Sequence, residues 1–175
     1  MKRKDFASAE EWQVYNWLNE ADEYGLVRGI EYQPGPFELS PRVRVKGLKR
    51  LKTKSKEIDK FLFHPHKYTP DFGFTVVSDA FKRVFKHPQE GLYGADVIID
   101  VKGGFNPFGD PKQFSINQKW MFQKFGLYVE KIVPEKLFKK TWVPEVCRWT
   151  EKQHKPVKKY IGVMTVGEFV YRLAA

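Results

Sequence analysis

The chain has 175 residues, of which 42% are hydrophobic and 16% aromatic, a composition typical of one globular domain with a substantial core. Its formal net charge of +10 indicates a polyanionic partner such as nucleic acid or an anionic membrane surface. The single cysteine, Cys147, excludes an intrachain disulfide, and no apolar run approaches the ~18 residues that a membrane span needs. We therefore expect a cytoplasmic protein with no membrane partner.

A first helix is predicted over residues 8–24. Ser8 can cap its start, and Glu11 follows three positions later as the second half of a capping box. Gly25 is a typical helix terminator. Both Glu10 and Glu11 lie at the margins of the apolar face, so either acid fits the periodicity, and Glu11 has a purely structural reading as a capping residue. The apolar face consists of Val14, Tyr15, Trp17, Leu18 and Ala21.

Two strands are predicted at residues 27–33 and 37–45, around a Pro34-Gly35-Pro36 turn. The following segment, residues 42–67, contains ten Lys or Arg residues and only two acids. Such a dense run favours a loop or hairpin that contacts nucleic-acid phosphates, and a solvated loop is the alternative. The candidate nucleic-acid-binding residues are Lys46, Lys49, Arg50, Lys52, Lys54 and Lys56.

Two short segments carry the candidate chemistry. Asp71 follows Tyr-Thr-Pro, and a predicted strand at 95–101 runs through an apolar stretch to Asp100, with Lys102 just after it. Because side chains alternate along a strand, Asp100 and Lys102 should point the same way. Desolvated charges are costly unless they are paired, so we expect a hydrated cation between Asp71 and Asp100, with Lys102 beside it. A second Asp-x-Lys, at residues 110–112, contains a proline that does not suit a central strand.

The remaining elements complete an α/β pattern. A short helix is predicted near 80–85, a longer one over 112–125 and a strand over 127–133. Gln118 should lie on the inner face of the longer helix, either near the site or bonded to backbone. In the aromatic tail, residues 134–175, we expect an edge strand at 159–164 and a final helix from Thr165.

The sequence resembles the PD-(D/E)xK nuclease superfamily. Its motif is present as Pro70-Asp71 followed by Asp100-Val101-Lys102, and the stretch from Phe6 to Glu11 is similar to the Phe-x-Ser-x-x-Glu of bacteriophage endonuclease I resolvases and related small phage nucleases. The similarity covers residues 6–41 and 67–133. It implies a restriction-endonuclease-like core at about 6–133, with a central mixed sheet flanked by helices, a basic insertion at 42–67 and a C-terminal extension at 134–175.

The resemblance also implies a divalent-metal-dependent DNA endonuclease. Mg²⁺ or Mn²⁺ would be held by Asp71, Asp100 and the Val101 carbonyl, with Glu11 completing the site directly, through water or at a second metal. Lys102 would orient the attacking water or offset negative charge at the phosphate. The implied catalytic set is Glu11, Asp71, Asp100, Lys102 and Gln118.

Several functional alternatives stay open at this level. The enzyme could be a phage-encoded resolvase of branched DNA acting in the host cytoplasm, or a nicking or sequence-specific endonuclease on the same fold. In a non-catalytic nucleic-acid-binding protein, the basic segment would act and the acids would be structural. A homodimer is compatible with each alternative.

Overall fold

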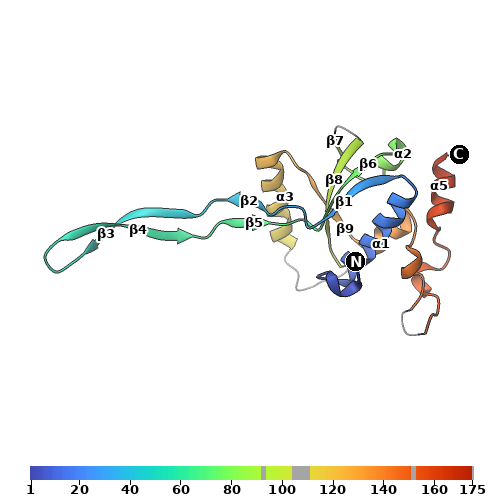
Figure 1. The fold of residues 1–175 in the computed structure, drawn as a ribbon, viewed down its shortest axis with the longest axis horizontal. Coiled ribbons are helices and arrows are strands. Elements are labelled where there is room, and N and C mark those ends of the chain that lie inside the picture. Colours follow the sequence, from blue (N-terminus) through green and yellow to red (C-terminus); the bar gives the residue numbers. More distant parts are fainter. Residues whose placement is uncertain (92–93, 104–110, 151–152, 175) are drawn as a thin grey trace.

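The computed structural model describes residues 1–91, 94–103, 111–150 and 153–174, and these form an α/β fold (Figure 1). Among them, β1 and β6 pair antiparallel, β6 and β8 pair antiparallel, and β9 runs parallel to β8. Strand β7 pairs with the first residues of β8. The sheet strands are β1 (Val27–Tyr32), β6 (Phe72–Val76), β7 (Gln89–Gly91), β8 (Gly94–Val101) and β9 (Val129–Ile132).

Helices cover both faces of this sheet. Helix α1 (Ala9–Glu23) packs on one face, where Ile99 of β8 is buried. Helix α3 (Pro111–Phe125) packs on the other face, where Met121 lies in a second cluster with Ile98. Neighbouring residues of β8 therefore contact different helices, as strand alternation requires. The predicted helices at 8–24 and 112–125 and the predicted strand at 95–101 are confirmed.

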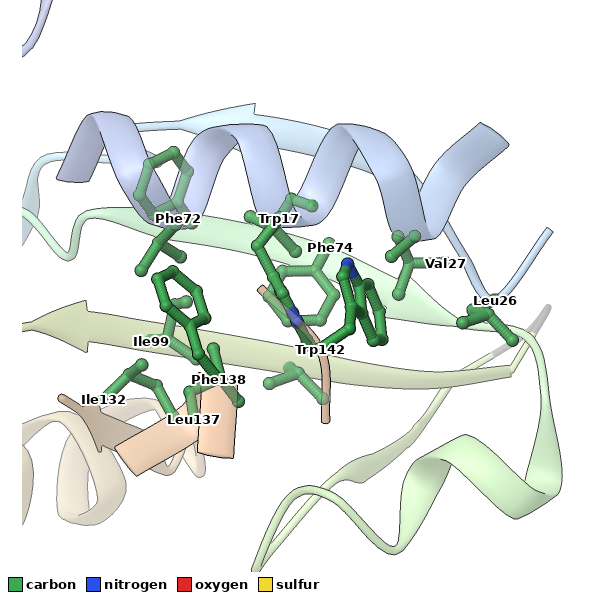
Figure 2. Packing of buried hydrophobic residues seen from close by; sticks show 14 of the residues in the cluster. Trp17, Leu26, Val27, Phe72, Phe74, Ile99, Ile132, Leu137, Phe138 and Trp142 are labelled. Atoms are coloured by element: carbon green, nitrogen blue, oxygen red, sulfur yellow. The ribbon is translucent and has the colours of Figure 1, made fainter. Parts of the chain in front are cut away.

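The C-terminal extension is part of the main core. Trp142, just after α4 (Pro134–Lys140), stacks on Trp17 of α1 with ring centroids 4.8 Å apart (Figure 2). The indole of Trp17 donates to Thr141 Oγ1 at 3.0 Å, and that of Trp142 donates to a Glu20 carboxylate oxygen at 2.9 Å. Helix α5 (Val166–Ala174) adds Phe169 to the same cluster.

The edge strand predicted at 159–164 is wrong. The chain forms a 3-10 helix at Lys158–Tyr160, and the buried Tyr160 ring packs 5.8 Å from that of Phe138. Gly162 then takes a φ of +80°, a conformation that ends any extended run. Thr165 caps the final helix, as predicted, by accepting from Glu168 N at 3.3 Å.

The short connecting elements differ in smaller ways from expectation. The predicted helix near 80–85 is present as α2 (Asp79–Lys82), and 3-10 helices occur at Arg3–Asp5 and Glu145–Cys147. The single strand predicted at 37–45 is instead two strands, β2 (Phe37–Ser40) and β3 (Val43–Arg50), which pair with different partners. No helix in the described ranges is long and apolar enough to cross a membrane.

The basic segment is a regular hairpin that extends far from the body (Figure 1). At its root β2 pairs with β5 (His66–Tyr68), and further out β3 pairs with β4 (Ser55–Phe63). Every residue of β4 is exposed. We call residues 37–68 the arm, and β3 with β4 the distal ribbon.

The stacking of Trp142 on Trp17 leads to a stability prediction. Trp142→Ala should lower the free energy of unfolding by about 3–5 kcal/mol, because it empties a fully buried site and removes a hydrogen bond to Glu20. Trp149→Ala is the control: that ring is 39% exposed, so its loss should cost only about 0.5 kcal/mol. Urea denaturation of both variants measures the difference, and equal losses would contradict a core role for the extension.

Candidate functional site

Asp71 is fixed against strand β8 by its backbone and its side chain. Its N–H donates to the Ile99 carbonyl at 3.1 Å, and the Val101 N–H donates to Asp71 Oδ2 at 2.6 Å. The Asp71 carbonyl in turn accepts from Gln33 N at 2.8 Å. The carboxylate is thereby placed where β6 begins beside the end of β8.

Asp100 and Lys102 lie on the same side of the chain, as predicted. Lys102 Nζ is 2.6 Å from Asp100 Oδ2, and the Lys102 side chain is 43% exposed whereas that of Asp100 is 4% exposed. The contact is an ion pair without hydrogen-bond geometry, because Oδ2 has no hydrogen-bond partner among the described residues. The negative charge of a buried carboxylate oxygen is thus balanced by one partly exposed ammonium group.

The charge of Asp100 acts on Asp71. Burial, followed by the negative charge of Asp100, raises the pKa of Asp71 to about 7. Glu11 raises it further, while the Val101 N–H and Lys102 act in the opposite direction. The predicted convergence of Asp71, Asp100 and Lys102 is therefore present.

Tyr68 is a member of this site that sequence reasoning missed. Its hydroxyl is buried and lacks a hydrogen-bond partner within the described ranges. Burial, then the charges of Asp100 and Asp71 and the approach of the hydroxyl to the Asp100 carboxylate, raise the pKa of Tyr68 above its ordinary value. The sequence signal was its place in the Tyr-Thr-Pro-Asp stretch, but only the pairing of β5 with β2 shows where the ring lies. The buried Tyr68 hydroxyl thus faces the Asp100 carboxylate, and neither Tyr68 Oη nor Asp100 Oδ2 makes a hydrogen bond of good geometry in the described ranges.

Glu11 combines the capping role with a place near the aspartates. Its backbone N–H donates to Ser8 Oγ at 3.1 Å, which confirms Ser8 as the helix cap, but the Glu11 carboxylate bonds the Ser8 hydroxyl and not the Ser8 backbone N–H of the predicted capping box. Its two carboxylate oxygens accept from the Ser8 hydroxyl and from the Tyr32 hydroxyl, each at 2.9 Å. Tyr32 was not identified from the sequence. Glu11 is therefore held in a fixed orientation from which its charge acts on Asp71.

The neighbouring acid, Glu10, approaches the other end of the site. A Cβ placed on Gly103 would lie 3.5 Å from Glu10 Oε1, and Gly103 directly follows Lys102. Both acids at the start of α1 thus lie near residues of the candidate site, but only Glu11 is buried.

Gln118 is bonded to the backbone, which is the second of the two alternatives predicted for it. Its amide donates to the Val129 carbonyl at 2.6 Å. It lines an open cavity of about 630 Å³ that none of the other predicted catalytic residues lines. The residues around the cavity are Lys86, His87, Pro88, Gln89, Gln118, Lys119, Phe122 and Tyr128.

The histidines of the arm and Cys147 have contacts of their own. His66 Nε2 lies 2.9 Å from Asn117 Oδ1, and the His64 ring packs 4.4 Å from that of Phe61. Burial raises the pKa of the Cys147 thiol to about 12, which keeps it protonated. Asp110 of the second Asp-x-Lys lies outside the described residues, and Pro111 begins a helix.

Comparisons of the chain with protein-family models, with curated proteins and with solved structures find no match. The chemistry must therefore be judged from the site itself. Within the described ranges, no group of three His, Cys, Asp or Glu side chains forms a ready metal cluster. The donor set of Asp71 and Asp100 nevertheless suits Mg²⁺, which is usually bound by one or two carboxylates and keeps several waters. Asp100 Oδ2, which is buried and contacts the Lys102 ammonium group without a hydrogen bond, is the oxygen that fits a cation best.

The raised pKa of Asp71 predicts how stability depends on pH. The pKa of Asp71 in the folded protein lies above its ordinary value of 3.8. The stability that this carboxyl group contributes is therefore complete below pH 3.8 and is lost as the pH rises through about 7. At about pH 8 without metal, Asp71→Asn should therefore increase the free energy of unfolding by at least ~1.4 kcal/mol, the value of one pKa unit.

Urea denaturation in a chelator at about pH 4 and about pH 8 measures this effect. The gain from Asp71→Asn should shrink at the lower pH, where the wild-type carboxyl is protonated. Asp96→Asn, at an exposed position of β8, is the control and should show no such difference. A gain that is equal at both pH values would contradict the electrostatic account.

Proposed function

We propose that this protein is a divalent-metal-dependent DNA endonuclease with a restriction-endonuclease-like core. The observation that carries the proposal is the buried pair of carboxylates, Asp71 and Asp100, held on adjacent strands with Lys102 beside them. Such a pair is unfavourable in a metal-free protein and favourable once a cation binds, so the arrangement supports metal binding.

The residues have distinct roles in this proposal. Asp71 and Asp100 would hold the cation through carboxylate oxygens, with the Val101 carbonyl as a further predicted ligand. When bound, Mg²⁺ or Mn²⁺ supplies Lewis-acid stabilisation of the phosphate and lowers the pKa of a coordinated water. Glu11 keeps a fixed negative charge near Asp71 and, through its hydroxyl partners, fixes the start of α1.

Lys102 would act on the substrate in this proposal. Its ammonium group is anchored to Asp100 but is partly exposed, so the same group can face an incoming phosphate. A fixed positive charge at that point stabilises negative charge that develops in the transition state. Lys102 also neutralises part of the buried charge of Asp100.

The substrate class follows from charge. The net charge is +10, and the distal ribbon concentrates cations on exposed strands. Polyanion binding of this kind does not depend on the base sequence and would hold DNA to the protein. Cleavage assays on supercoiled, linear and branched DNA, with Mg²⁺ or with a chelator, test the proposal and separate nicking, sequence-specific and junction-resolving activity. Absence of Mg²⁺-dependent cleavage on all three would reject it.

The first functional prediction concerns the metal ligands. Asp100→Asn should lower Mg²⁺-dependent cleavage by about 10³-fold or more, because it removes a charged ligand and with it several kcal/mol of charge stabilisation. DNA affinity should survive, since it comes mainly from phosphate contacts elsewhere. Asp96→Asn on the same strand is the control and should cleave like wild type. Full activity of a folded Asp100→Asn protein would exclude Asp100 from the site.

A second functional prediction concerns Lys102. Lys102→Ala should lower the cleavage rate by about 10²–10³-fold, the usual effect of losing one group that stabilises transition-state charge. Metal binding, measured by calorimetry with Mn²⁺, should persist because an ammonium group is not a ligand. Lys102→Arg keeps the positive charge and should retain more activity than the alanine variant. Loss of metal binding in a folded Lys102→Ala protein would show that the residue mainly holds Asp100 in place.

A further inference from the structure

The distal ribbon has two faces that differ in charge. Residues directly paired in an antiparallel ribbon share a face, and successive residues alternate between faces. Both acids of the ribbon lie on one side, the mixed face: Arg44, Lys46, Leu48, Arg50, Ser55, Glu57, Asp59 and Phe61. The other side, the acid-free face, consists of Val45, Gly47, Lys49, Lys56, Ile58 and Lys60.

The acid-free face carries uncompensated positive charge. Lys49 is directly opposite Lys56, and like charges at such positions destabilise a ribbon. Within the described ranges, no cation between Arg42 and Lys67 forms an ion pair. A two-stranded ribbon that packs on nothing is at best marginally stable in water. An anionic partner would relieve the repulsion on this face.

Gly47 supplies an independent observation on the same face. Glycine weakens the interior of a strand and often marks a bulge or a close approach by a ligand or another backbone. The irregularity in this ribbon lies between Val43 and Arg44, away from Gly47. A Cβ on Gly47 would meet only Lys60 Cβ, at 4.0 Å, so packing within the chain does not require glycine there. Because Gly47 has no side chain, a partner can come close to the backbone between the lysines of this face.

We infer that the acid-free face is the surface through which the arm holds duplex DNA, with the mixed face turned away from the duplex. Charge complementarity selects the partner, because this face presents cations, a flat centre and no acid to a regular array of phosphates. A two-stranded ribbon also fits the major groove of B-DNA. The inference rests on the proposed nuclease function, and it assigns the arm's contacts to Lys49, Lys56 and Lys60.

The length of the arm places these contacts along the duplex. Lys60 and Lys56 precede Tyr68 by eight and twelve residues, or about 27 and 41 Å at ~3.4 Å per residue. At ~3.4 Å per base pair, these distances correspond to roughly 8 and 12 base pairs. The arm would therefore hold the DNA about one helical turn from the point of cleavage.

Two matched triple variants test the assignment. Lys49, Lys56 and Lys60 are replaced with Gln in one protein, and Arg44, Lys46 and Arg50 in the other, so that each loses three positive charges from the same ribbon. Both are made in the Asp100→Asn background, and binding to a duplex of roughly 30 base pairs is measured at several salt concentrations. The acid-free triple should reduce the slope of log affinity against log salt by ~2.7, and the mixed triple should reduce it much less.

A second pair of variants tests the role of Gly47. Gly47→Val increases β propensity and should leave the ribbon folded by circular dichroism. It should raise the Kd for the duplex, whereas Leu48→Val on the mixed face should not. Hydroxyl-radical footprints should show DNA protected about 8–12 base pairs from the cut. This protection should be lost only in the variants of the acid-free face.

The outcomes separate this inference from the proposed function. Equal slope changes for the two triples, with wild-type cleavage intact, would overturn the facial assignment and leave the nuclease proposal standing. Wild-type protein that neither binds nor cleaves DNA would overturn both. A change of sedimentation coefficient caused only by the acid-free triple would assign this face to contact between copies of the chain and would also overturn the inference.

Discussion

Two hydrogen bonds from Asp71 to strand β8 hold the candidate site together. They reach Ile99 and Val101, the residues on either side of Asp100, at 3.1 and 2.6 Å. The two carboxylates therefore cannot separate without opening the pairing of β6 with β8. That pairing is in turn kept in register by the buried face of β6, which begins with Phe72 directly after Asp71. The hydrophobic core thus sets the spacing of the two acids.

This constraint has an electrostatic cost that packing alone does not remove. Burial and the charge of Asp100 raise the pKa of Asp71 to about 7, and the buried Tyr68 hydroxyl and Asp100 Oδ2 lack hydrogen bonds of good geometry. A sequence selected only for stability would place apolar or hydrogen-bonded groups at these positions. Departures of this kind are typical of functional sites, and a divalent cation with its waters would compensate both the charges and the unsatisfied oxygens.

Local signals were sufficient to predict most helices and the central strand. Ser8 with Glu11, and the apolar run that ends at Asp100, each lie within a few residues, and strand alternation correctly placed Lys102 beside Asp100. The roles of Tyr32 and Tyr68 could not be predicted because strand pairing between distant segments brings them to the site. The strand predicted at 159–164 failed because burial of the Tyr160 ring overrides the local pattern.

The arm shows most clearly what a sequence count leaves out. Ten cations and two acids give the segment its charge, but the register of β3 and β4 decides where that charge lies. Glu57 and Asp59 are two positions apart, so they share a face whatever the register. A slip of one residue would move both acids onto the face of Lys49 and would balance its charge. The bulge at Val43 and Arg44 and the distal turn, where Leu51 N donates to the Lys54 carbonyl at 2.8 Å, bound the ribbon and fix that register. The charge asymmetry of the arm is therefore a property of its hydrogen-bond ladder, and a partner that reads this asymmetry would also stabilise the register that creates it.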